Sequence, residues 1–141
     1  MENQNLIDAE LGRLVIRDNA DRQYIYLVES GGSRGFPIVI GNAEAGEIYR
    51  VLHREEPPRP LTHQLAFDLV SGLGARIRHA DIVDLKHNTF YAQLTLENEA
   101  GDVVAVVDAR PSDAIALALR ARCGIRVAEE VFRRTTEDGS A

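Results

Sequence analysis

The sequence predicts an α+β fold in which a curled, mostly antiparallel β-sheet packs with about three helices in a single domain. Segments rich in β-branched residues alternate with segments of helical periodicity, and turn residues separate them. The length of 141 residues is typical of one domain, and 45% hydrophobic residues suffice for one core. We therefore expect one domain over residues 1–132, followed by a disordered polar tail over residues 133–141.

The first part of the chain is predicted to contain three strands and a helix. Leu11–Arg17 and Gln23–Glu29 carry β-branched and aromatic residues on either side of the turn-rich segment DNADR. The short apolar segment Phe36–Gly41 is typical of a buried strand. Asn42 is a suitable cap for a helix over Ala43–Arg54, which the prolines of EEPPRP then end.

A second helix is predicted over His63–Leu73. Thr62 is expected to cap this helix, and Gly74 is expected to end it. Its apolar residues recur at helical spacing and are expected to line the buried side: Leu65, Ala66, Leu69, Val70 and Leu73.

Three antiparallel strands are expected next, over Ala75–Leu85, Phe90–Glu97 and Val103–Asp108. The alanine and leucine content of the following segment then favours a helix, with Ser112 and Asp113 as cap and first-turn carboxylate.

The apolar arc of this last helix is wide. Burial against the sheet and against another helix or a second subunit would explain it. Gly124 is expected to stop the helix, and Ile125–Phe132 is expected to form a short strand and one helical turn.

Composition excludes several classes of protein. The net charge of −6 argues against a protein that coats nucleic acid by bulk electrostatics. A single cysteine, Cys123, allows neither an intrachain disulfide nor a cysteine-based zinc cluster. The N-terminal segment lacks the apolar stretch of a secretory signal, and no apolar run reaches the roughly 20 residues of a membrane span. We therefore expect a cytoplasmic protein that does not bind membranes.

The segment DARPSD, where a strand meets a helix, is the strongest candidate site. A helix N-terminus offers unpaired N–H groups, and Arg110 could bind a phosphate. Asp108 and Asp113 could hold a divalent cation beside that phosphate. Alternatively the segment is structural, with Arg110 paired to Asp108 while Ser112 and Asp113 cap the helix.

The segment RPLTH has a similar character. It brings Arg59 and His63 to the start of another helix, where His63 could act as a general base, a metal ligand or a phosphate donor. The alternative is that Thr62 caps the helix and His63 is solvated. Glu44, in the first turn of the first helix, is a further candidate or a partner of the helix dipole.

Four segments in this order resemble the bifunctional nuclease family: FPIVIGNAEAGEI (36–48), RPLTHQL (59–65), FYAQL (90–94) and DARPSDAIALALR (108–120). The resemblance covers roughly residues 11–132. It implies a compact α+β domain that forms oligomers, with DNase and RNase activity. The polar motif positions of the family fall on Glu44, Arg59, Thr62, His63, Asp108, Arg110, Ser112 and Asp113.

One motif position departs from the family pattern. Where the family usually has aspartate after RPLTH, this chain has Gln64, which is a much poorer ligand for a hard cation. If that aspartate were a metal ligand, this chain would lack it.

Two hypotheses follow from the sequence. In the first, the chain hydrolyses phosphodiester bonds of DNA and RNA with a divalent cation, Mg²⁺ or Mn²⁺, held by Asp108 and Asp113. Arg59, Arg110 and Ser112 would hold the substrate phosphate, and His63 would assist proton transfer. In the second, it is a non-catalytic oligomerising or regulatory module that binds an anion or a protein partner.

Overall fold

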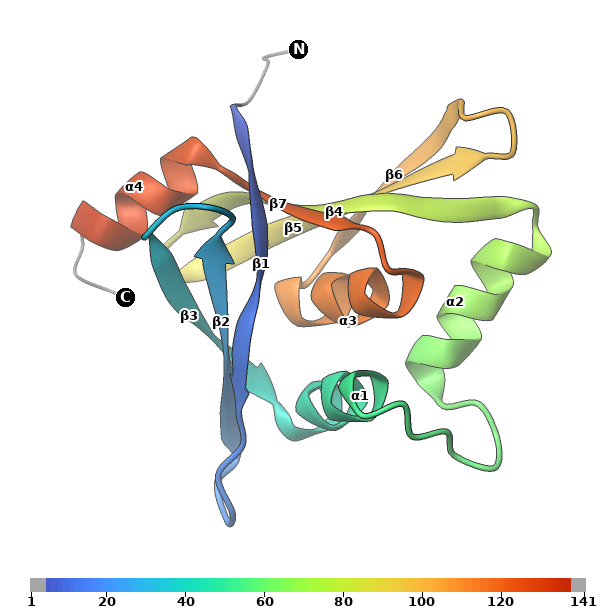
Figure 1. Ribbon diagram of the computed structural model, residues 1–141, viewed down its shortest axis with the longest axis horizontal. Coiled ribbons are helices and arrows are strands. Elements are labelled where there is room, and N and C mark those ends of the chain that lie inside the picture. The colour runs from blue at the N-terminus through green and yellow to red at the C-terminus, as the bar shows by residue number, and fades with distance from the viewer. Residues whose placement is uncertain (1–4, 138–141) are drawn as a thin grey trace.

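A computed structural model describes residues 5–137 and confirms the α+β fold class, with one bent sheet and four helices in this range (Figure 1). The strands are β1 (Leu6–Val15), β2 (Arg22–Glu29), β3 (Gly35–Gly41), β4 (Ala75–Lys86), β5 (Thr89–Asn98), β6 (Val103–Ala109) and β7 (Gly124–Ala128). The helices are α1 (Asn42–Leu52), α2 (Thr62–Gly72), α3 (Pro111–Ala121) and α4 (Glu129–Glu137). Among these residues, none of the helices has the length and apolar character needed to cross a lipid bilayer.

The seven strands form one sheet in the order β3-β2-β1-β7-β4-β5-β6. Two antiparallel meanders, β1–β3 and β4–β6, make up its two halves. β7 joins them, because it pairs antiparallel with β1 and parallel with β4. The sheet bends between the halves, and α1, α2 and α3 lie together near the bend, whereas α4 lies toward the other side of the view (Figure 1).

The core follows from strand alternation. In β2 and β3 every second side chain is buried, including Ile25, Leu27 and Ile38. The arc of α3 that the sequence singled out is buried within the chain, against β4, β5 and the helices α1 and α2. That arc is therefore not available to a second subunit.

Aromatic side chains close the end of the core near α4. Phe36 stacks on Phe90, with ring centroids 5.2 Å apart, and meets the ring of Phe132 edge-on at 5.5 Å. Phe132 belongs to α4, which is longer than the single turn expected. Residues 133–137 are helical rather than a disordered tail, because this helix buries Val131, Phe132 and Thr135. The rest of the predicted tail, 138–141, lies outside the described residues.

In each of the three helices near the bend, the polar residue that the sequence suggested as a cap is already helical: Asn42 and Thr62 are the first residues of α1 and α2, and Ser112 is the second residue of α3. Gly41, Leu61 and Arg110 occupy the cap positions, and no side chain caps these helices. In α1, Asn42 is helical, and its Oδ1 accepts a hydrogen bond from Gln23 instead. In α3, Pro111 takes the first helical position, where its fixed φ suits a helix and its missing N–H costs nothing.

The buried side of α2 was predicted correctly for Ala66 and Val70 and wrongly for its three leucines. Ala66, Phe67 and Val70 lie on its less exposed side, and the last two pack on the core. Leu65, Leu69 and Leu73 instead face solvent. The helix has two apolar stripes, and the one that contains Phe67 and Val70 packs on the core.

Candidate functional site

A cavity of about 660 Å³ lies where α1, α2 and α3 begin, and we call it the helix-start cavity. Its lining includes Glu44 of α1, Thr62 and His63 of α2, and Arg110 and Asp113 of α3 and its cap. The first turn of a helix carries N–H groups without a helical acceptor and a partial positive charge. Three such helix starts around one cavity favour the binding of an anion there.

Four side chains connect the three helices at this cavity. His63 Nε2 lies 2.8 Å from Asp113 Oδ1. Arg110 donates from Nε to Asp113 Oδ2 at 2.9 Å and from Nη2 to Glu44 Oε2 at 3.1 Å. The chain His63–Asp113–Arg110–Glu44 therefore fixes the positions of the three helix starts relative to one another.

The contacts among these four side chains fix the charges of Asp113 and Arg110. Burial alone would raise the pKa of Asp113, but the hydrogen bonds from Arg110 and His63 outweigh it, so the pKa lies below its ordinary value. The hydrogen bonds to Asp113 and then to Glu44 raise the pKa of Arg110. At neutral pH the site thus contains an ionised Asp113 and a permanently cationic Arg110.

Both His63 and Arg110 keep capacity for a ligand. Asp113 engages Nε2 of the His63 ring, so Nδ1 is the nitrogen left to exchange a proton. Arg110 uses two of its five N–H groups in the bonds above, and its side chain is 65% exposed. An oriented imidazole beside an accessible guanidinium can support proton transfer next to a bound anion.

Arg50 is a lining residue that the sequence did not reveal. It lies in the last turn of α1, and one of its Nη2 hydrogens is donated to Glu47 at 3.3 Å. Its Nε is buried without a hydrogen-bond partner among residues 5–137. Spacing along the helix offered no signal for it, because its approach to the cavity depends on how α1 packs on α3.

Of the residues predicted from the sequence, Glu44, Thr62, His63, Arg110 and Asp113 line the helix-start cavity, whereas Arg59, Asp108 and Ser112 do not. Arg59 is exposed in the proline-rich loop before α2.

Asp108 is exposed on β6 opposite Gln93, and its side chain contacts no partner within the described chain. Arg110 pairs with Asp113 and Glu44 rather than with Asp108, so the structural alternative for this corner named the wrong carboxylate.

The donor set at the cavity does not match a metal site made of protein ligands alone. No group of three or more His, Cys, Asp or Glu side chains within residues 5–137 is arranged to hold a metal ion. Both carboxylate oxygens of Asp113 already accept hydrogen bonds. A divalent cation at Asp108 and Asp113 would need most of its ligands from substrate and water.

Gln64 lies outside the helix-start cavity. Its Oε1 accepts a hydrogen bond from Arg120 of α3, and its Nε2 donates to Asp68 Oδ1 at 2.7 Å. It lines a smaller cavity of about 310 Å³ together with Glu47. An aspartate could accept from Arg120 but could not donate to Asp68, so glutamine suits this neighbourhood.

Comparison with known proteins agrees with the motif resemblance. Residues 25–139 match the family model described as the bifunctional nuclease domain. An uncharacterised protein of Mycobacterium tuberculosis is 44% identical over 108 residues, which cover 77% of this chain and 63% of that protein.

Plant proteins are more distant. A protein named bifunctional nuclease 1 from Oryza sativa subsp. indica is 27% identical over 116 residues, covering 81% of this chain and 35% of the rice protein. Bifunctional nuclease 2 from Arabidopsis thaliana is 28% identical over 102 residues, covering 71% of this chain and 31% of the plant protein. The chain thus spans about three fifths of the mycobacterial relative and about a third of the plant relatives. The family match extends over most of its length, and the chain belongs to the bifunctional nuclease domain family.

Proposed function

We propose that this chain is a nuclease domain that hydrolyses phosphodiester bonds of DNA and RNA in the helix-start cavity. The observation that carries the proposal is the meeting of three helix starts around the His63–Asp113 pair and Arg110. The names of the plant relatives point to the same chemistry.

The helix starts and two arginines would hold the substrate phosphate. Arg110 has free N–H groups, and Arg50 adds a second guanidinium to the lining. Because Glu44 and Asp113 are both paired with Arg110, their charges repel a phosphate less than free carboxylates would. This pairing of charges at the cavity would allow an anionic substrate to bind there although the chain has a net charge of −6.

His63 would act as the general base. Asp113 holds Nε2, so Nδ1 would take a proton from the attacking water as its oxygen bonds to phosphorus. The bond from phosphorus to the leaving sugar oxygen breaks, and that oxygen takes a proton from solvent. Arg110 would stabilise the charge that develops on the phosphoryl oxygens.

Cation dependence is a separate part of the proposal. Asp108 and Asp113 would hold a divalent cation, which would supply positive charge near the substrate phosphate, and Arg59 and Ser112 would contact substrate outside the cavity. Chelator and the Asp108→Asn variant test this part, because both should lower activity if Asp108 holds a cation. Full activity of that variant and in chelator would limit the machinery to His63, Asp113 and Arg110.

The central experiment measures cleavage of single-stranded DNA and RNA by the purified chain. We expect His63→Ala, Asp113→Asn and Arg110→Ala each to lower the rate by about 100-fold or more, which is typical when an acid–base or charge-stabilising group is lost. His53→Ala is the matched control, because His53 is exposed on the surface and lines none of the cavities above. Folded His63→Ala and Arg110→Ala variants that cleave like wild type would refute the assignment.

An oligomerising role is a second candidate, and surface leucines favour it. Leu61, Leu65, Leu69 and Leu73 are spaced by four residues along α2 and are all exposed. The edge strand β6 also exposes valines: Val103, Val104, Val106 and Val107. Apolar surface of this kind marks interfaces, so we propose that a second copy of the chain covers it. Light scattering separates this role from catalysis, and a dimer that cleaves would satisfy both.

A further inference from the structure

The outer face of the first meander, on the side of the sheet away from the core, combines aromatic and basic side chains. In β2, Ile25 and Leu27 are buried in the core. Strand alternation therefore places Arg22, Tyr24 and Tyr26 on the outer face.

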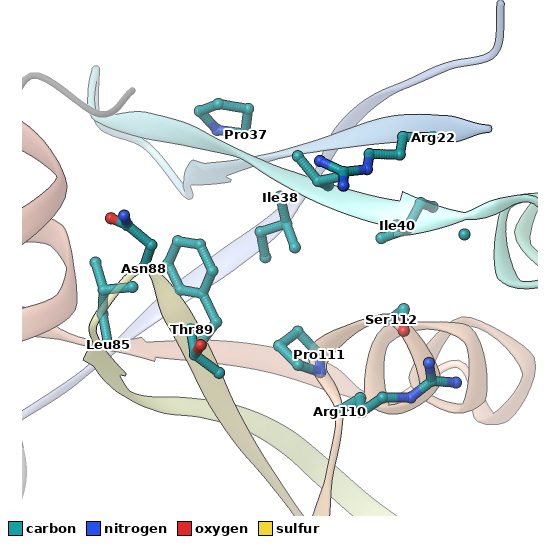
Figure 2. A pocket seen from close by; sticks show the side chains of 13 residues that line it. Arg22, Pro37, Ile38, Ile40, Leu85, Asn88, Thr89, Arg110, Pro111 and Ser112 are labelled. Carbon is teal, nitrogen blue, oxygen red and sulfur yellow. The ribbon is translucent and has the colours of Figure 1, made fainter. Parts of the chain in front are cut away.

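The neighbouring strands extend this face. Arg13 of β1 lies opposite Tyr26, and Pro37 of β3 lies opposite Tyr26 on its other side. Figure 2 shows Arg22 and Pro37 on one side of β3, whereas Ile38 lies on the other side, toward α3. We define the basic face as Arg13, Arg17, Arg22, Tyr24 and Tyr26.

Each tyrosine of the basic face holds one arginine. Cζ of Arg13 lies 4.3 Å from the centroid of the Tyr26 ring, and Cζ of Arg17 lies 5.1 Å from the centroid of the Tyr24 ring. The attraction between a guanidinium and the face of an aromatic ring keeps both cations on the sheet surface. A guanidinium over a ring still has N–H groups and a second planar side to offer a ligand.

The three arginines of the basic face keep their charges free for a partner. Arg13, Arg17 and Arg22 are exposed, and none of them forms an ion pair within residues 5–137. Asp18 and Asp21, in the turn between β1 and β2, do not pair with them either. Most other arginines in the described part of the chain pair with a carboxylate. On a chain of net charge −6, the basic face is therefore a local surface suited to a polyanion.

Single-stranded nucleic acid fits this arrangement of groups. Its backbone carries regularly spaced phosphates, which guanidinium groups bind through paired N–H donors. Its unpaired bases stack on tyrosine rings and on guanidinium planes, whereas the bases of a duplex are already stacked on one another. Tyr24 and Tyr26 are two residues apart on one strand, so their backbone positions are about 7 Å apart and each ring can serve a different base.

The Arg22 end of the basic face adjoins the helix-start cavity. Arg22 is paired with Gly41, the residue in the cap position of α1. The next residue, Asn42, lines the cavity. In Figure 1, β3 leads directly into α1. A nucleic-acid strand bound along β2 therefore has to pass only the end of β3 to bring a phosphate to the cavity.

We propose that the basic face binds single-stranded DNA or RNA and guides it to the helix-start cavity. Arg13, Arg17 and Arg22 bind phosphates of the backbone, and bases stack against the two arginine–tyrosine pairs. The choice of nucleic acid rests on the proposed nuclease function, for which this face would be the surface that docks the substrate.

The test is binding of a fluorescently labelled single strand of about 15 nucleotides, enough to cover a site of the usual size. Fluorescence anisotropy measures its binding to the whole chain in chelator at several salt concentrations. Arg13→Gln, Arg17→Gln and Arg22→Gln, combined in one chain, should weaken binding by at least about 10-fold. The slope of log affinity against log salt should fall by about 2, since each lost contact with a single-stranded phosphate removes about 0.7.

A second variant separates stacking from charge. Tyr24→Val with Tyr26→Val keeps every arginine and should weaken binding by about 10-fold without changing the salt slope. A duplex of the same sequence should bind more weakly than the single strand, because its bases are not free to stack.

Arg54→Gln, Arg122→Gln and Arg133→Gln, combined, are the matched control, because they remove the same charge from exposed positions outside the basic face. Unaltered melting temperatures show that the variants fold. A wild type that does not bind the single strand, equal losses in both triple variants, or equally tight binding of poly-glutamate would overturn the docking surface even if the chain cleaves nucleic acid. Binding that is lost only in the basic-face variants, without any cleavage, would support the docking surface and reject the nuclease.

Discussion

Glu47 links α1 to α3 through a buried ion pair. It is 1% exposed, and its carboxylate accepts hydrogen bonds from Arg120 of α3 and from Arg50 of its own helix. A buried carboxylate is tolerated only when it is paired and hydrogen-bonded. The pairing of Glu47 with two arginines meets this condition between two helices that line the helix-start cavity.

Replacing Glu47 with alanine should destabilise the chain by about 3–5 kcal/mol, because Arg120 would keep a partly buried charge without its carboxylate. Urea denaturation measures this change in the free energy of unfolding. Glu55→Ala, in the exposed loop after α1, is the control and should change it by less than about 0.5 kcal/mol. A loss below about 1 kcal/mol for Glu47→Ala would show that this network does not hold the helices.

His79 should make the stability of the fold depend on pH. Burial lowers its pKa below the ordinary 6.5, Asp81 opposes this effect, and Arg126 and Arg78 add to it. The unfolded chain therefore binds a proton more readily than the folded chain, so stability is complete above pH 6.5 and falls as the pH drops toward the lower folded value.

In His79→Gln this part of the acid sensitivity should disappear. Thermal unfolding between pH 7 and pH 5 measures it, with the exposed His53→Gln as the control. An identical pH dependence in wild type and His79→Gln would contradict the role given to burial.

Part of the candidate site could be read from the sequence at the residue scale. His63, Arg110 and Asp113 were predicted because proline and polar residues at a helix start are a local signal. The hydrogen bond between His63 and Asp113 was not predicted, because the two residues are far apart in the chain and meet only after α2 packs on α3. Arg50 was missed for the same reason.

At the scale of elements, α2 is the least embedded helix. None of its residues is fully buried, and Leu73 at its end is 86% exposed. Periodicity in the sequence indicated an amphipathic helix but could not decide between two apolar stripes. The strands were easier to predict, because the alternation of apolar and polar residues in β2, β3 and β5 indicates that one face of each strand is buried.

The exposed stripe of α2 makes self-association testable. We expect the wild type to exceed the mass of one chain at micromolar concentration, and Leu69→Lys with Leu73→Lys to shift it to the monomer. Both leucines are exposed, so the melting temperature of the monomeric part should barely change. Light scattering coupled to size exclusion measures the mass.

Ile16→Lys is the control, because it adds the same charge at another exposed apolar residue and should leave the mass unchanged. A wild type that stays monomeric over the same concentrations would remove the proposed interface.

At the scale of the whole molecule, the position of β7 determines how the two halves of the sheet are joined. The sequence correctly indicated a strand there, three earlier strands and a run of three antiparallel strands, β4–β6, but not that β7 lies between the two groups. Local patterns do not report pairing between distant segments, such as Leu6 with Ala128 or Ala80 with Ile125. The fold class was therefore predictable, whereas the strand order was not.

A chain that ends at Cys123 should fail to fold cooperatively, because β1 and β4 would lose the strand that pairs with both. Circular dichroism during heating would show the loss of a sharp transition. A chain that ends at Glu137 retains every described element and should unfold like the full-length chain. A sharp transition in the shorter chain would mean that the meanders fold without β7.

The central place of β7 also bears on synthesis by the ribosome. Each meander can form as soon as its own strands emerge, but the sheet stays divided until the segment 124–128 has left the exit tunnel. Until then β1 and β4 present unpaired edges, which attract foreign strands. The nascent chain is thus most exposed to misassociation late in translation, when a chaperone that shields those edges would help it most.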